Sequence, residues 1–145
     1  MRRKNKKQRS KHKSSAPKNR PNNSPTLGET PLLVFVSSLI DKMRRERDAV
    51  DRAVRSIPIT QPWLFENTPA SSQEVEESYL SKVRECNLFV LLLGYDYSAA
   101  VAREYQTAVE TGRPILAFIQ EGEKSTEQNE FIRSLRTKYA FYSSS

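Results

Sequence analysis

The chain has 145 residues and a formal net charge of +7, with a single cysteine and a single histidine. These two residues cannot form an internal disulfide or supply the four ligands of a structural zinc site, so a hydrophobic core must stabilise the fold and no metal site is predicted. The longest apolar run, Leu88–Leu93, is far shorter than the ~20 residues that span a bilayer, which excludes an integral membrane protein. No apolar segment of a secretory signal follows the charged N-terminus, so we expect a cytoplasmic protein.

The N-terminal segment carries most of the positive charge. Residues 1–28 contain ten lysines and arginines and no acidic residue, whereas the remainder is slightly acidic. Because this segment has few apolar residues, residues 1–30 are predicted to be a disordered tail and linker, followed by one domain at residues 31–145. Cations in residues 2–20 favour non-specific, salt-dependent contact with nucleic acid. The alternative is a solubilising or targeting leader.

The first half of the domain is predicted to contain two strands around an amphipathic helix. The continuous apolar run at residues 32–36 is typical of a strand buried on both faces of a parallel sheet. Residues 62–66 form a short second strand. Between them, apolar residues recur at helical spacing before Pro58 and define one buried stripe. This stripe comprises Ile40, Met43, Val50, Val54 and Ile57.

The second half continues the alternation. A helix that begins near Ser72 leads to residues 88–94, whose uniform apolarity predicts the central strand. A helix that ends at Gly112 precedes a fourth strand at 114–119. After a turn rich in Glu, Gly and Ser, a helix carries Phe131, Ile132, Leu135 and Tyr139, and residues 140–142 form a fifth strand. Single helices between successive strands predict a parallel sheet covered on both faces, a three-layer α/β sandwich of the flavodoxin-like type.

Open parallel sheets bind ligands beyond the carboxyl ends of their strands, where the winding direction reverses, here between the first and central strands. The first strand ends at Ser37 and Ser38, and the loop after the central strand supplies Gly94, Tyr95, Asp96 and Tyr97. We expect these residues to contact a ligand at this edge, with the serines on sugar or phosphate and the tyrosines against the ligand.

Glu104 is the candidate catalytic residue. It lies between Val101 and Ala108 on the inward side of its helix, so its carboxylate should project beside the core toward the strand ends. A shielded carboxylate there suits cleavage at an anomeric carbon, either by stabilising an oxocarbenium-like transition state or by forming a glycosyl intermediate. The alternative is an ion pair with Arg103, Arg113 or another cation.

Arg47 interrupts the apolar stripe of the first helix, between Met43 and Val50. Its guanidinium could hold a phosphate or carboxylate at the ligand site. Alternatively it has a structural role, in which it extends along its aliphatic stem or pairs with an acid such as Glu66.

Several segments together resemble a TIR-like family of domains of unknown function, often found at the N-termini of STAND-type signalling NTPases and bacterial defence proteins. The resemblance runs from about residue 32 to residue 142. It rests on the segments Val34–Ser38, Arg45–Val50, Arg84–Gly94, Glu104–Tyr105 and Ala108–Leu116.

The segment from Glu104 to Pro114 is also similar to the Glu-x-x-x-Ala-x-x-x-Gly-Lys-Pro stretch of nucleoside 2-deoxyribosyltransferases, whose glutamate is the nucleophile, and to the catalytic-glutamate helix of TIR-domain NAD hydrolases. The resemblance implies that Glu104 acts on an N-glycosidic bond of a nucleotide or nucleoside, with NAD as the leading substrate and no separate cofactor. Ala102 stands where the TIR-like family usually has a second acid. The rival expectation is a non-catalytic module that signals by associating with itself or with another signalling protein.

Overall fold

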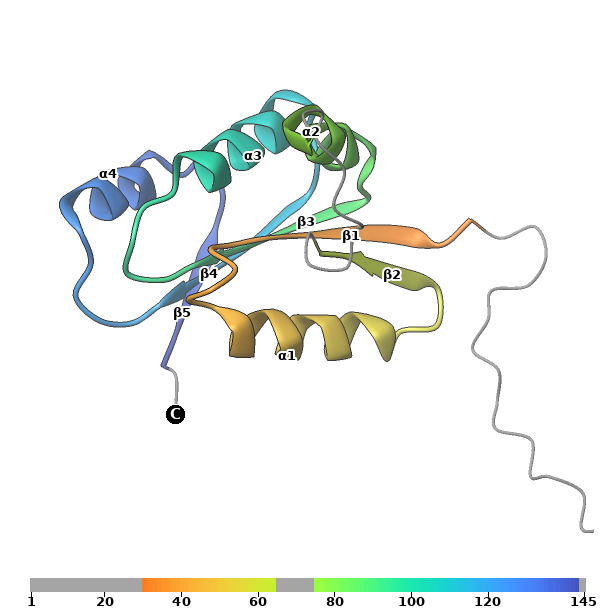
Figure 1. The fold of residues 1–145 in the computed structure, drawn as a ribbon, viewed down its shortest axis with the longest axis horizontal. Coiled ribbons are helices and arrows are strands. Elements are labelled where there is room, and N and C mark those ends of the chain that lie inside the picture. The colour runs from red at the N-terminus through yellow and green to blue at the C-terminus, as the bar shows by residue number, and fades with distance from the viewer. Residues whose placement is uncertain (1–29, 65–74, 144–145) are drawn as a thin grey trace, which may run out of the picture.

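Residues 30–64 and 75–143 are described by a computed structural model, shown in Figure 1. The predicted alternation of strands and helices is confirmed along them, whereas the tail at residues 1–29 and Glu66 lie outside the described residues. The strands are β1 (Leu32–Ser37), β2 (Thr60–Trp63), β3 (Leu88–Leu93), β4 (Ile115–Gln120) and β5 (Tyr139–Tyr142). The helices are α1 (Arg44–Arg55), α2 (Val75–Glu85), α3 (Ala99–Glu110) and α4 (Thr126–Ser134).

The five strands form one parallel sheet in the order β2-β1-β3-β4-β5. The central strand β3 is uniformly apolar because both of its faces are covered, with Phe89 and Leu91 on one face and Val90 and Leu92 on the other. The strand order confirms the flavodoxin-like fold. It also places the reversal of winding between β1 and β3, as expected.

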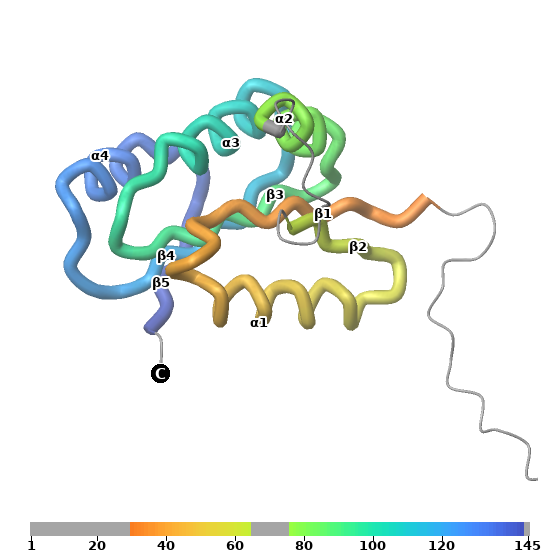
Figure 2. Tube along the Cα trace, in the orientation of Figure 1, coloured from red at the N-terminus to blue at the C-terminus, as the bar shows by residue number. Residues whose placement is uncertain are grey.

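The helices divide unequally between the two faces of the sheet. Figures 1 and 2 show α2, α3 and α4 together on one face and α1 on the other. The larger core cluster, which includes Phe35, Phe89 and Tyr105, lies under the three helices. The smaller cluster, which includes Val36 and Met43, lies under α1. Among the described residues, no helix is long and apolar enough to span a membrane.

The α1 face is covered only near β1 and β3. Leu116 and Phe118 of β4 pair in register with Val90 and Leu92 and therefore share this face, yet their side chains are 49% and 36% exposed. No helix in residues 30–64 or 75–143 packs over them, so the sheet carries an apolar, partly open strip along β4 on this face.

The first helix is shorter than its apolar stripe predicted. Met43 is the N-cap residue and Ser56 the C-cap residue, so Ile40 and Ile57 lie outside α1. The Thr60 hydroxyl donates to the carbonyl oxygens of Val54 (2.6 Å) and Ile57 (3.0 Å), which closes the turn into β2. Ile57 is 50% exposed as a result.

Candidate functional site

A cavity of about 290 Å³ opens at the carboxyl end of β1. After β1 the chain turns toward α1 on one face of the sheet, whereas after β3 it turns toward α3 on the other, so the two connections diverge and leave space between them (Figure 1). The lining residues are Phe35, Val36, Ser38, Leu39, Ile40, Asp41, Arg47, Trp63, Tyr79, Ser98, Ala100, Val101 and Glu104.

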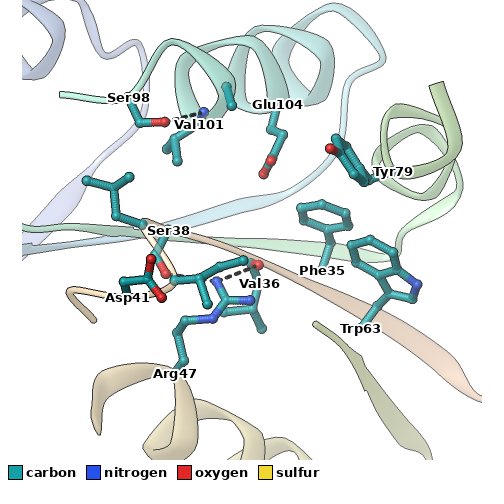
Figure 3. A pocket seen from close by; sticks show the side chains of 13 residues that line it. Phe35, Val36, Ser38, Asp41, Arg47, Trp63, Tyr79, Ser98, Val101 and Glu104 are labelled. Carbon is teal, nitrogen blue, oxygen red and sulfur yellow. Dashed lines mark hydrogen bonds between the residues drawn. The ribbon is translucent and has the colours of Figure 1, made fainter. Parts of the chain in front are cut away.

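The cavity has a polar end and an aromatic end (Figure 3). Side chains with oxygen or nitrogen atoms gather at the polar end, and three rings form the aromatic end. The polar end consists of Ser38, Asp41, Arg47 and Ser98. The aromatic end consists of Phe35, Trp63 and Tyr79.

The sheet register builds the aromatic end. Phe35 of β1 pairs with Trp63 of β2, so both side chains lie on the same face of the sheet. Their rings stack with centroids 4.8 Å apart and planes 15° from parallel, and Tyr79 of α2 lies 6.4 Å from Trp63. The packed rings give this end of the cavity a fixed apolar wall.

Glu104 enters the cavity from α3. The hydroxyl of Ser98 caps this helix by accepting from the backbone N–H of Val101 (3.3 Å), which fixes where the first turn begins. Val101 and Tyr105 are buried in the core on either side of Glu104 in sequence. Figure 3 shows the Glu104 carboxylate pointing into the cavity between its polar and aromatic ends.

The position of Glu104 changes its acidity. Burial disfavours the charged form and raises the pKa of Glu104 to about 7, although the Ser37 hydroxyl and the positive charge of Arg47 act in the opposite direction. Glu104 is therefore partly protonated near neutral pH. The cations named as alternative partners make other contacts: Arg103 pairs with Glu76, and Arg113 donates to the carbonyl oxygens of Thr111 and Cys86.

Arg47 is buried, with 2% of its surface exposed. It is carried by the stripe of α1 that also buries Val54, and this stripe faces the sheet. Its Nη1 donates to Ser38 Oγ (2.8 Å) and to the carbonyl oxygen of Val36 (3.3 Å). Arg47 therefore holds the end of β1 and also brings a positive charge to the cavity wall.

Ser37 lies beneath Glu104 and is 1% exposed. It shares the α3 face of β1 with Phe35, because alternate residues of a strand point the same way. Its Oγ has no hydrogen-bond partner within residues 30–64 and 75–143, yet it is close enough to Glu104 to lower the pKa of that carboxyl. A small rearrangement would allow this hydroxyl to donate to the ionised carboxylate.

Residues 94–97 of the loop after β3 do not line this cavity, whereas Ser98, the last residue of the loop, does. Asp96 forms an ion pair with Lys42 (2.7 Å), and the ring of Tyr97 meets Phe131 edge to face at 5.9 Å. Tyr95 packs against Gly122, where an added Cβ would come within 2.8 Å of the Tyr95 ring. Gly94, Tyr95 and Asp96 instead line a second cavity of about 350 Å³, together with Leu39, Lys42, Met43 and Gln120.

A third cavity, of about 270 Å³, adjoins the site on its aromatic side, between α2 and α3. Tyr79, Ala100 and Glu104 line both this α2–α3 cavity and the cavity at the end of β1. Arg103 and Glu76 form an ion pair across it from facing helices. Within the described ranges, no three His, Cys, Asp or Glu side chains are grouped closely enough to hold a metal ion.

The structure thus brings Glu104, Ser37, Ser38 and Arg47 together, whereas Gly94, Tyr95, Asp96 and Tyr97 do not line the same cavity. Trp63, Tyr79 and Asp41 also line the cavity but were not among the predicted site residues. Trp63 ends β2 as Ser37 ends β1, and ends of neighbouring parallel strands share one edge. That shared edge was the available signal for Trp63, whereas no local pattern marks Tyr79 or Asp41.

Comparisons with known proteins agree with this fold. No curated protein matches the chain. Among solved structures, the CMP N-glycosidase BcmB of Clostridium botulinum is similar in fold, with a TM-score of 0.57 and 16% sequence identity over 76% of this chain and 88% of that chain. The sequence model of one family, described as "Domain of unknown function (DUF4062)", matches residues 33–143. The chain therefore belongs to the DUF4062 family.

Proposed function

We propose that this domain binds a nucleoside or nucleotide in the cavity at the end of β1 and hydrolyses its N-glycosidic bond, with Glu104 as the reactive carboxylate. One observation carries the proposal: a half-buried carboxyl, with a pKa raised to about 7, points into a cavity between a polar and an aromatic end. The similar fold of a CMP N-glycosidase supports this choice of chemistry.

The two ends of the cavity suit the two parts of such a substrate. A nucleobase is flat and has a π-face, which suits the wall formed by Phe35, Trp63 and Tyr79. The sugar, with or without phosphate, has hydroxyl and anionic oxygens that suit Ser38 and Arg47 at the polar end. This orientation brings the bond between base and sugar to the middle of the cavity, beneath Glu104.

The ionised Glu104 carboxylate would act on the anomeric carbon as the bond to the base breaks. The base leaves with the bonding electron pair and takes up a proton. The carboxylate stabilises the positive charge that develops on the sugar, or bonds to it as a glycosyl ester. A water molecule then adds its oxygen to the anomeric carbon and releases a proton. Low polarity around Glu104 strengthens its attraction for the developing charge.

The test is release of free base from nucleoside monophosphates, nucleosides and NAD by the purified protein. We expect Glu104→Gln to lower release by about 10³-fold or more, because the neutral amide cannot stabilise the developing cation or bond to it. Glu110→Gln is the matched control, since Glu110 is exposed on the same helix and accepts a hydrogen bond from the Gln106 side chain. Equal release by wild type and Glu104→Gln, or no release by wild type, would contradict the proposal.

A second candidate is a TIR-like signalling module that works by self-association rather than by chemistry. The partly exposed Leu116 and Phe118 on the α1 face of β4 favour it, because contiguous apolar surface marks contact sites. Light scattering over a range of concentrations tests it. An assembly that dissociates in Phe118→Asp, together with no base release by any assembled form, would favour this candidate over hydrolysis.

A further inference from the structure

The α2–α3 cavity continues the site beyond its aromatic end. It shares Tyr79, Ala100 and Glu104 with the cavity at the end of β1, so the two cavities meet at these residues. Two charged side chains line that space, Glu76 from α2 and Arg103 from α3. Both keep more than half of their side-chain surface exposed and are therefore accessible to a ligand.

We propose that the α2–α3 cavity is the subsite that reads the polar edge of the nucleobase, with Glu76 and Arg103 as the specificity-determining pair. This inference rests on the proposed function, because it takes the base to lie at the aromatic end. The edge of a base that stacks near Tyr79 would border the α2–α3 cavity, because Tyr79 lines both cavities.

The chemistry of the pair favours bases that carry an exocyclic amine beside a ring acceptor, as cytosine and adenine do. A carboxylate only accepts hydrogen bonds, and a guanidinium only donates them. Glu76 therefore suits an exocyclic amine, and Arg103 suits the ring nitrogen or carbonyl oxygen beside it. Cytosine carries this combination, whereas uracil presents a carbonyl oxygen where cytosine has its amine. An oxygen facing the Glu76 carboxylate leaves both acceptors without a donor, which disfavours binding.

An ion pair that merely links two helices is the competing explanation, and exposed pairs contribute little to stability. The two explanations differ in what Glu76→Gln should do. The glutamine amide can donate as well as accept, so it tolerates an amine or a carbonyl oxygen. We expect this variant to lower the preference for cytidine 5′-monophosphate over uridine 5′-monophosphate by about tenfold or more in kcat/KM. Release from the uridine nucleotide should rise, because the glutamine amide can donate to the carbonyl oxygen that the carboxylate disfavours.

Glu77→Gln is the matched control. Glu77 lies next to Glu76 on α2, is exposed and pairs with Arg84 (2.6 Å) instead of Arg103, and the substitution makes the same change of charge. A second measurement does not require bond cleavage. Calorimetry measures the binding of the two nucleotides to Glu104→Gln and to the double variant that also carries Glu76→Gln. The preference for the cytidine nucleotide should disappear only in the double variant.

The outcomes separate the two proposals. If nucleotides bind with a Glu76-dependent preference but no base is released, the hydrolytic function fails and the subsite stands. If base is released but Glu76→Gln lowers both substrates equally, or acts no differently from Glu77→Gln, the subsite is overturned and the hydrolytic function stands. If neither nucleotide binds to wild type or to Glu104→Gln, both proposals fall.

Discussion

The end of β1 and the loop after β3 lie at the same edge of the sheet, yet they are used differently. At the end of β1, the buried side chains of Ser38 and Arg47 line a cavity into which Glu104 projects. In the loop after β3, Asp96 and Tyr97 are exposed and contact Lys42 and Phe131. One region encloses space, and the other connects neighbouring loops and helices.

The difference shows that polar residues at strand ends have two uses. Where they are buried around a cavity, as at the end of β1, their charges and hydroxyl groups can interact with a bound ligand. Where they are exposed, as after β3, they contact side chains of neighbouring segments, such as Lys42 and Phe131. The sequence pattern does not distinguish the polar residues after β1 from those after β3, because their burial depends on packing between distant segments. Substitutions of residues at the cavity and of residues in or next to the exposed loop should therefore have different effects, which tests the comparison.

The largest expected effect concerns stability and pH. Because the pKa of Glu104 is raised from 4.5 to about 7 in the folded state, the native protein retains a proton that the unfolded chain releases. The free energy of unfolding should then fall as the pH rises from about 4.5 to 7, by about 3 kcal/mol in total from this one group.

Urea unfolding of wild type and Glu104→Gln at a series of pH values measures this effect. The variant has no carboxyl to titrate and should lack the fall, so the difference between the two curves isolates the group. Identical pH dependence in both proteins would mean that Glu104 is solvated like a surface acid.

The next effect compares two cations: Arg47, which lines the cavity, and Lys42, which pairs with Asp96 of the loop after β3. Arg47→Met removes the donor to Ser38 Oγ and the Val36 carbonyl oxygen, which should lower the free energy of unfolding by about 2 kcal/mol because buried acceptors lose their partner. Lys42→Met removes an exposed ion pair with Asp96 and should cost less than about 1 kcal/mol. Denaturant midpoints measure both, and equal costs would erase the distinction between the regions.

A glycine tests the loop without touching the cavity. Gly122 has φ +127°, and an added Cβ would come within 2.8 Å of the Tyr95 ring. Gly122→Ala should therefore cost about 1 kcal/mol or somewhat more through backbone strain and displacement of Tyr95. Base release by the folded variant should stay at the wild-type rate. A loss of release without a loss of stability would show that the β3–α3 loop belongs to the site.

The smallest effect concerns Ser37. Its hydroxyl lowers the pKa of Glu104 but has no hydrogen-bond partner among the residues that the structure describes. Ser37→Ala should therefore move the midpoint of the Glu104-dependent pH effect upward while leaving the free energy of unfolding at low pH almost unchanged. A midpoint that moves downward would mean that the hydroxyl does not favour the ionised carboxylate.

The fold follows from local patterns, and so does part of the site. The apolar run of β3 and the single helices between successive strands predicted a parallel sheet. Glu104 and Arg47 stood out because each is charged and lies on or beside a buried helical stripe. The aromatic end was harder to predict, since Phe35 and Trp63 meet only through the register of β1 with β2.

Other features depend on packing between distant segments. The α2–α3 cavity depends on how these two helices pack against each other, and no periodicity in either helix encodes that packing. The end of α1 depends on hydrogen bonds from Thr60 across the following turn, so the apolar stripe alone placed Ile57 inside the helix. The exposure of Leu116 and Phe118 on β4 also could not be predicted, because apolar residues in a strand are expected to be covered and only the tertiary structure shows that no helix in the described part of the chain packs over these two.

The most direct test is an NMR titration of the Glu104 carboxyl carbon, with and without cytidine 5′-monophosphate. The account predicts a pKa near 7 for the free protein and a clear displacement of this resonance when the nucleotide is added. A pKa near 4.5, with a resonance that the nucleotide leaves unmoved, would contradict the account, because Glu104 would then be an ordinary surface acid outside any nucleotide site.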